Sequence, residues 1–314
     1  MKKDLMVFSG NANRGMALGI CEHLQIPLSR LDISRFSNDN LFVQVRESVR
    51  EKDVYIVQPF TQPVSDHIME LLIALDALRS ASARRVTAVI PYFSYSRSDK
   101  KDAPRISITG RLMADLVKKA GANRVLTMDL HADAVHGFFS IPVDNLTAIP
   151  TISAHFQTVI DKKRTVAVAT DAGGAKRVGI FAQRLGVPLA IIDKRRLDDT
   201  HVVQGVVVGD VANRDAIVFD DEISTAGTLV ETVKTLKQGG ARQIHVGVTH
   251  PVLCGPAVDN LNNLAIESLV VTNTTSVDDK EKKLDHLEVL SVAGIFAEAI
   301  RRIHEGESMG PLFR

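Results

Sequence analysis

The chain has 314 residues, of which 45% are hydrophobic and 24% are charged. This composition is typical of a globular protein with one large or two medium-sized domains. The 38 lysines and arginines nearly balance the 37 aspartates and glutamates, so no global field would draw the chain to nucleic acid or to a membrane, and any anion site must be local.

The N-terminal sequence differs from a signal peptide, because Asp4 and only a short apolar run follow the first lysines. No stretch approaches the ~20 apolar residues of a membrane span, so we expect a cytoplasmic protein. The two cysteines, Cys21 and Cys254, lie far apart in the sequence. We interpret them as small apolar core residues rather than as a disulfide or a zinc site.

The first predicted elements are a strand over 5–8 and a following helix. Gly10 and Gly15 have the spacing of a Walker-type loop, but Met16 stands where that loop requires lysine, so a kinase of that type is not indicated. The next segment, 35–40, reads Arg-Phe-Ser-Asn-Asp-Asn, and its spacing alone predicts a hairpin turn with one partly exposed aromatic residue.

Alternating strands and helices continue along the chain. They are predicted at 52–58 (strand), 66–79 (helix), 85–90 (strand), 109–120 (helix) and 125–130 (strand). The charged segment after Pro91 is by itself typical of a solvated loop. A lone histidine more often packs than binds a ligand, but His131 follows a predicted parallel strand at the end where open α/β sheets place ligand groups.

The pattern of the first half recurs in the second. Asp53-Val-Tyr-Ile-Val and Asp215-Ala-Ile-Val-Phe each precede a helix and then an Ala-Arg-started strand. This similarity indicates two related α/β domains, with a boundary near 148–150. Further strands are predicted at 165–169, 189–192, 243–249, 267–272 and 287–292, and a last helix at 293–305.

The most informative stretch is 216–230. An apolar strand is predicted to end at Asp220 and Asp221, and a small, hydroxyl-rich loop over 224–228 then leads into a helix. The N–H groups at a helix N-terminus can bind a phosphate, whereas two carboxylates beside it suit sugar hydroxyls or a metal. The pattern therefore predicts a sugar-phosphate site; the alternative is an ordinary capped strand–helix turn.

Two more segments carry candidate residues. Asp171 follows a predicted strand and precedes two glycines and a helix, so it suits hydrated Mg²⁺, a helix N-cap, or both. The strand over 189–192 runs into a cationic segment with Lys194 and Arg196, for which a solvated strand end is the alternative.

The loop resembles the phosphoribosyl-diphosphate (PRPP) loop of type I phosphoribosyltransferases and, among them, that of ribose-phosphate diphosphokinases. Their loop reads Asp-Asp-x-x-Asp-Thr-Ala-Gly-Thr, and only Ser224 departs from it here. The resemblance extends from Phe8 to Phe313. It implies an α/β fold of two similar phosphoribosyltransferase-type domains, each a mainly parallel sheet flanked by helices. Domain 1–148 would carry the ATP loop and oligomer contacts and domain 149–314 the ribose 5-phosphate loop, with the last helix a candidate to pack on the N-terminal domain.

The resemblance also implies roles for matching residues. The family's Arg-Phe-Ser-Asp-Gly-Glu, Pro-Tyr-Phe-x-Tyr-x-Arg-Gln-Asp-Arg-Lys and Asp-Leu-His-Ala segments correspond to 35–40, 91–101 and 129–132. They imply ATP binding by Phe36, Asn38, Asn40, Arg97, Ser98, Asp99 and His131. The ribose 5-phosphate residues would be Asp220, Asp221, Ser224, Thr225, Ala226, Gly227 and Thr228. Lys194 and Arg196 would be catalytic, and His131 and Asp171 would associate with Mg²⁺.

The implied reaction is Mg²⁺-dependent transfer of the β,γ-diphosphoryl group of ATP to the C1 hydroxyl of ribose 5-phosphate, which gives PRPP and AMP. The family analogy implies a homohexamer, and no nucleic-acid or membrane partner is expected. Two alternatives stay open: a phosphoribosyltransferase that consumes PRPP, and a non-catalytic regulatory homologue. The changes at Asn38, Asn40, Ser98 and Ser224 leave nucleotide selectivity and ribose contacts open, and no general base is assigned.

Overall fold

The computed structural model describes residues 4–193 and 205–313. The chain divides into two compact units. Unit 1 holds the described residues up to Thr147, the short segment Thr274–Ser276 and the C-terminal segment from Ser291. Unit 2 holds Ala148–Asn273 and Val277–Leu290. Within the described residues, no helix combines the length and the apolar character that crossing a bilayer requires.

Unit 1 is built on a parallel five-stranded sheet with the order β1-β4-β5-β6-β7. The strands are β1 (Leu5–Ser9), β4 (Asp53–Val57), β5 (Arg85–Ile90), β6 (Arg124–Met128) and β7 (Val143–Leu146). All of β4 and most of β5 is buried, as expected for strands covered on both faces. A separate antiparallel hairpin joins β2 (Leu31–Arg35) to β3 (Leu41–Val45).

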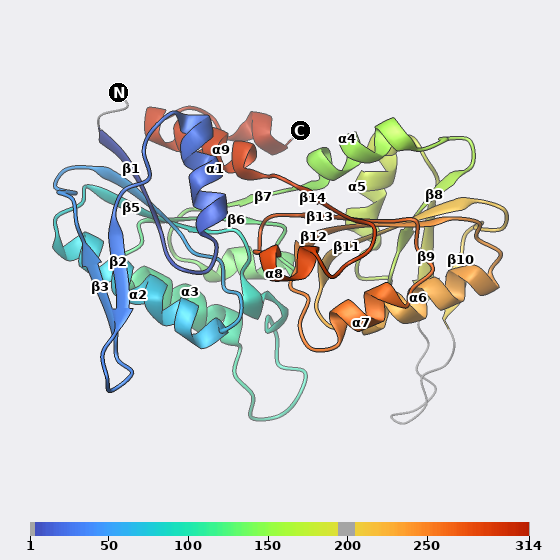
Figure 1. Cartoon of the computed structure of the whole chain (residues 1–314), viewed down its shortest axis with the longest axis horizontal. Coiled ribbons are helices and arrows are strands. Elements are labelled where there is room, and N and C mark those ends of the chain that lie inside the picture. The colour runs from blue at the N-terminus through green and yellow to red at the C-terminus, as the bar shows by residue number, and fades with distance from the viewer. Residues whose placement is uncertain (1–3, 194–204, 314) are drawn as a thin grey trace. The chain divides into compact units, whose positions relative to one another are not determined.

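Helices cover both faces of this sheet (Figure 1). One face carries α1 (Arg14–Leu24) and α9 (Ala293–Glu305), and the other carries α2 (Val64–Ser80) and α3 (Thr109–Ala120). Helices α1 and α9 approach closely at Gly19, where an added Cβ would lie 3.0 Å from the Cβ of Ala293. Unit 1 also contains the short 3-10 helices η2 (Ser94–Arg97), η3 (Asp133–Phe138) and η4 (Gly310–Phe313).

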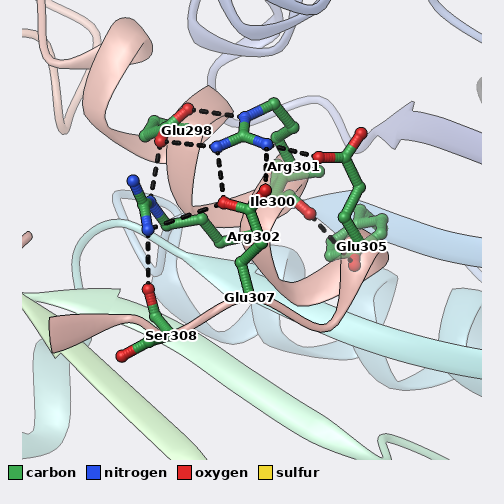
Figure 2. A network of polar contacts seen from close by, with 8 residues as sticks. Glu298, Ile300, Arg301, Arg302, Glu305, Glu307 and Ser308 are labelled. Atoms are coloured by element: carbon green, nitrogen blue, oxygen red, sulfur yellow. Dashed lines mark hydrogen bonds and ion pairs between the residues drawn. The ribbon is translucent and has the colours of Figure 1, made fainter. Parts of the chain in front are cut away.

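A network of ion pairs ties the C-terminal segment to α9 (Figure 2). The Arg301 guanidinium bridges Glu298 and Glu307, and Arg302 donates to Glu298 at 2.7 Å and to the Ser308 carbonyl at 2.8 Å. The hydrogen bonds and charge of these arginines lower the pKa of both Glu298 and Glu307. The pairs lie near the surface, where salt screens them, so we assign them a role in fixing the segment rather than in overall stability.

Unit 2 contains a seven-stranded sheet with the order β10-β9-β8-β11-β12-β13-β14, in which β10 alone runs antiparallel to its neighbour. The strands are β8 (Thr165–Ala169), β9 (Leu189–Asp193), β10 (Val206–Val208), β11 (Asp215–Ile223), β12 (Ile244–Pro251), β13 (Ser268–Thr272) and β14 (Leu287–Leu290). One face is covered by α4 (Ile149–Val159) and α5 (Ala175–Leu185), and the other by α6 (Gly227–Gln238) and α7 (Ala257–Asn262) (Figure 1). A single turn, α8 (Asp278–Glu281), precedes β14.

The predicted α/β fold is confirmed, and the helices predicted at 109–120 and 293–305 have the predicted bounds. The prediction that the acidic pair ends its strand is wrong. Strand β11 continues past Asp221 to Ile223, because β12 runs on to Pro251 and stays paired with it there. The pair therefore lies inside a strand that β8 accompanies only as far as Phe219.

Candidate functional site

The acidic pair lies on the central strand of unit 2, between β8 and β12. Successive strand residues point to opposite faces, so Asp220 and Asp221 do not share one. Phe219, two residues before Asp221, stacks on Phe181 of α5 with ring centroids 4.4 Å apart. Asp221 therefore lies on the α5 face, where its Oδ1 forms an ion pair with Nη1 of Arg177 at 2.5 Å. Asp220 lies on the opposite, α6 face.

Asp220 is the electrostatically perturbed member of the pair. Its carboxylate accepts from the Thr170 hydroxyl at 2.9 Å and from the backbone N–H of Asp221 at 2.9 Å. Burial, and then the negative charge of Asp221, raise the pKa of Asp220 from 3.8 to about 7 despite these bonds. A carboxylate held in this way becomes more acidic when a cation or a hydroxyl donor arrives.

Replacing Asp220 by asparagine is expected to stabilise the ligand-free protein at pH 8. The folded state keeps the Asp220 proton up to about pH 7, whereas the unfolded state loses it near 3.8, so wild-type stability falls as pH rises between these values. The asparagine oxygen still accepts one hydrogen bond, and the free energy of unfolding should rise by roughly 1–3 kcal/mol above pH 7. Urea unfolding at pH 4 and pH 8 measures the difference; equal effects at both pH values would contradict it.

The loop 224–228 turns the chain from β11 into α6. Ala226 has a left-handed backbone with φ 64°, although it is not a glycine. A left-handed residue beside a right-handed one, here Gly227 at the start of α6, makes successive N–H groups converge into an anion-binding concavity. Among the described residues, no acceptor binds the backbone amides of 225–229, and the first helical donor is Val230, which bonds to the Ala226 carbonyl. The predicted anion site is thus open.

Asp171 begins the turn between β8 and α5. Its carboxylate is exposed, and one oxygen accepts from the Gly174 amide at 2.9 Å. The N-cap of α5 is Gly174, so the prediction that Asp171 caps this helix is wrong; its carboxylate instead closes the turn that precedes α5. Within 4–193 and 205–313, no group of three or more His, Cys, Asp and Glu side chains has the arrangement of a metal site. The cationic residues Lys194 and Arg196 lie outside the described residues, directly after Asp193 at the end of β9.

In unit 1, Phe36, Asn38 and Asn40 occupy the tip of the β2–β3 hairpin. Phe36 is 56% exposed and contacts the ring of Phe42 at 5.4 Å between centroids. The side-chain oxygen Oδ1 of Asn38 accepts from the backbone N–H of Asn40 at 3.3 Å, and Asp39 has a left-handed backbone with φ 69°. The spacing-based prediction of a hairpin turn with an exposed aromatic residue is confirmed.

The other candidate residues of unit 1 lie after β5 and β6. Arg97 is exposed, and Asp99 is half-buried. The Ser98 hydroxyl accepts from the Thr109 amide at 3.0 Å and donates to the Ser107 carbonyl at 3.3 Å, so it already supports the start of α3. Exposed His131 lies two residues after Asp129, which has a left-handed backbone with φ 39°.

Several neighbours of the acidic pair and the loop are missing from the sequence-based prediction. They are Thr170, Arg177, Cys254 and Asn260. Thr170 and Arg177 flank the predicted Asp171 motif, and that proximity was the available signal. Cys254, interpreted as an ordinary core residue, is half-buried, and its sulfur lies 3.1 Å from the Ser224 hydroxyl.

Two α/β units, one of them with an acidic strand that leads into an open amide loop, define a protein of the phosphoribosyltransferase-type class. Comparison with known families refines this class. Residues 5–121 match the N-terminal domain of ribose phosphate pyrophosphokinase, and 203–314 match the phosphoribosyl synthetase-associated domain. The chain belongs to the ribose-phosphate pyrophosphokinase family.

Individual relatives match along their whole length. A ribose-phosphate pyrophosphokinase of Deinococcus radiodurans is 51% identical over 99% of this chain and 98% of its own. Ribose-phosphate pyrophosphokinase 2 of Schizosaccharomyces pombe is 44% identical over 98% of this chain and 97% of its own. The crystal structure of phosphoribosylpyrophosphate synthetase from Mycobacterium smegmatis superposes with a TM-score of 0.91 at 37% identity, covering 97% of this chain and all of that one.

Proposed function

We infer that this protein is a ribose-phosphate diphosphokinase. It transfers the β,γ-diphosphoryl group of ATP to ribose 5-phosphate and releases AMP and PRPP. The observation that carries this conclusion is the open amide loop beside the acidic pair, in a chain that shares the family's full length. A phosphoribosyltransferase would explain the loop, but it would not explain the match of residues 5–121 to the pyrophosphokinase N-terminal domain.

The reaction requires alignment of the two substrates and compensation of negative charge, and the candidate residues can supply both. The C1 hydroxyl oxygen of the sugar bonds to the β-phosphorus as the bond from that phosphorus to the bridging oxygen of AMP breaks, and the hydroxyl proton passes to solvent. Such a transfer requires alignment and charge compensation rather than covalent help. We propose that the amides of 225–229 hold the 5-phosphate and that Asp220 and Asp221 orient the ribose hydroxyls.

The remaining assignments rest on the family resemblance. Phe36, Asn38 and Asn40 would contact the base of ATP, and Arg97, Ser98, Asp99 and His131 the rest of the nucleotide. Lys194 and Arg196 would offset the charge of the moving phosphates. Protein of this family is proposed to act in the cytoplasm as a homo-oligomer, a hexamer by analogy.

Magnesium would supply charge neutralisation on the phosphates of ATP. The residues present fit this ion, because Mg²⁺ keeps most of its waters and binds one or two carboxylates together with substrate phosphates rather than a full protein cage. Asp171 offers an exposed carboxylate with one oxygen that contacts no donor among the described residues. His131 is proposed to contact the ion through water, since Mg²⁺ prefers oxygen ligands.

A product assay tests the proposal. Incubation with ATP, ribose 5-phosphate and Mg²⁺, without any nucleobase, is expected to release AMP and PRPP in equal amounts. A phosphoribosyltransferase would release no AMP under these conditions and would instead consume PRPP with a base. A regulatory homologue would bind the substrates without turnover, and either result would contradict the proposal.

A further inference from the structure

The segment that follows β12 donates hydrogen bonds to the backbone at the start of the loop 224–228. We call residues 252–260 the supporting segment. Its backbone amides at Leu253 and Cys254 donate to the carbonyls of Ile223 and Ser224, each at 2.9 Å. The Asn260 side-chain amide donates to the next carbonyl, that of Thr225, at 2.9 Å. One segment thus binds three consecutive carbonyls, those of the last residue of β11 and of the first two residues of the loop.

These bonds determine where the loop amides point. In a trans peptide unit the C=O and the following N–H lie on opposite sides. A carbonyl of Ser224 or Thr225 that faces the supporting segment therefore turns the amide of Thr225 or Ala226 away from it. Those two amides belong to the group without an acceptor in the described part of the chain. The supporting segment thus presets the anion-binding side of the loop.

The supporting segment is itself held in an unusual conformation. Leu253 is left-handed with φ 50° and Gly255 with φ 55°. A leucine in this region costs about 1–2 kcal/mol, and the burial of Leu253 (2% exposed) in the core of unit 2 offsets that cost. The Lys280 ammonium also holds the first residue of the segment through the Val252 carbonyl at 3.1 Å. Strain that the surroundings maintain is typical of functional sites.

Asn260 is the member of this arrangement that mutation can remove, because the other two donors are backbone groups. We propose that Asn260 is a positioning residue of the sugar-phosphate loop. It acts through the Thr225 carbonyl and does not touch the substrate. The inference rests on the proposed function, since it assumes that the loop binds the 5-phosphate of ribose 5-phosphate. Loss of the hydrogen bond from Asn260 lets the peptide group between 225 and 226 rotate. Binding of ribose 5-phosphate must then order this peptide group, which lowers the affinity.

The primary test is Asn260→Ala, measured in steady state and by calorimetric titration with ribose 5-phosphate. One neutral hydrogen bond corresponds to a roughly three- to tenfold increase in the KM and Kd for ribose 5-phosphate. The KM for ATP should stay within twofold of wild type, and so should kcat. The matched control is Asn263→Ala, because the side chain of Asn263, the residue directly after α7, also donates to a backbone carbonyl, that of Asp259, at 2.8 Å.

Asn260→Asp separates positioning from general stability. An aspartate has an ordinary pKa of about 3.9, so its carboxylate is ionised at neutral pH; it keeps the shape of the side chain but repels the Thr225 carbonyl. The Kd for ribose 5-phosphate should therefore rise further in Asn260→Asp than in Asn260→Ala, while kcat and the KM for ATP stay within twofold of wild type. A merely structural role would leave the Kd of Asn260→Asp near that of wild type, because the shape of the side chain is kept.

The outcomes are distinct. Wild-type protein that binds ribose 5-phosphate while Asn260→Ala binds it equally well overturns this inference alone. Equal losses in Asn260→Ala and Asn263→Ala also overturn it, because they would report on α7 rather than on the loop. Wild-type protein that fails to bind ribose 5-phosphate overturns both this inference and the proposed function.

Discussion

Replacing Lys194 by alanine is expected to lower kcat by about 10²- to 10³-fold, while ATP binding stays measurable. The Lys194 ammonium group is proposed to compensate negative charge on the transferred phosphates, and this charge is larger in the transition state than in bound ATP. Removal of one such preorganised group typically costs this factor. Initial rates of AMP release give kcat, and calorimetric titration with a non-transferable ATP analogue gives the Kd.

The matched control is Lys163→Ala. Lys163 is an exposed lysine of the same unit, and its removal changes the net charge by the same amount. We expect turnover of the Lys163 variant within twofold of wild type. Unchanged turnover in the Lys194 variant would remove this residue from the mechanism.

Replacing Gly227 by aspartate is expected to raise the KM for ribose 5-phosphate by about 100-fold or more. Within 4 Å, a Cβ at this position meets only the Thr225 hydroxyl oxygen, at 3.7 Å, so a side chain enters open space beside the loop amides. A carboxylate there takes the place of the phosphate and repels it. Two like charges about 5 Å apart near a protein surface repel by about 3 kcal/mol, which corresponds to this factor.

Folding should survive the same substitution. Gly227 begins α6, and an acidic residue in the first turn of a helix is favoured by the helix dipole. The melting temperature should therefore equal or exceed that of wild type, as should that of Gly227→Ala, which removes a flexible glycine from a helix. Gly227→Ala should bind ribose 5-phosphate with intermediate affinity. Wild-type affinity in the aspartate variant would show that the phosphate binds elsewhere.

Both experiments address residues that the sequence identifies without a structure. The loop is recognisable because its chemistry is local: small residues, hydroxyl groups and a helix start follow one another over 224–228. The same holds for the helices at 109–120 and 293–305, whose apolar periodicity and turn residues are contained in the segment. The roles of Lys194 and of the ATP-binding residues came from family resemblance alone and remain predictions.

The end of strand β11 could not be predicted from the residues near it in the sequence. Asp220 and Asp221 look like the end of an apolar strand, because the hydrophobic run ends there. The pairing of Glu222 with His250 and of Ile223 with Pro251 keeps the strand extended. The ion pair of Asp221 with Arg177 and the raised pKa of Asp220 likewise depend on the register of β11 against its neighbours and on the placement of α5.

The sequence by itself determined the α/β class, the order of most elements and the position of the hydroxyl-rich loop over 224–228, since each depends on residues close together in the chain. The tertiary structure decided what surrounds that loop. Thr170 and Asp220 are 50 residues apart, and Asn260 and Thr225 are 35 apart. Such contacts form only when strand register and helix orientation are set by the packing of the whole core, and no short pattern encodes them.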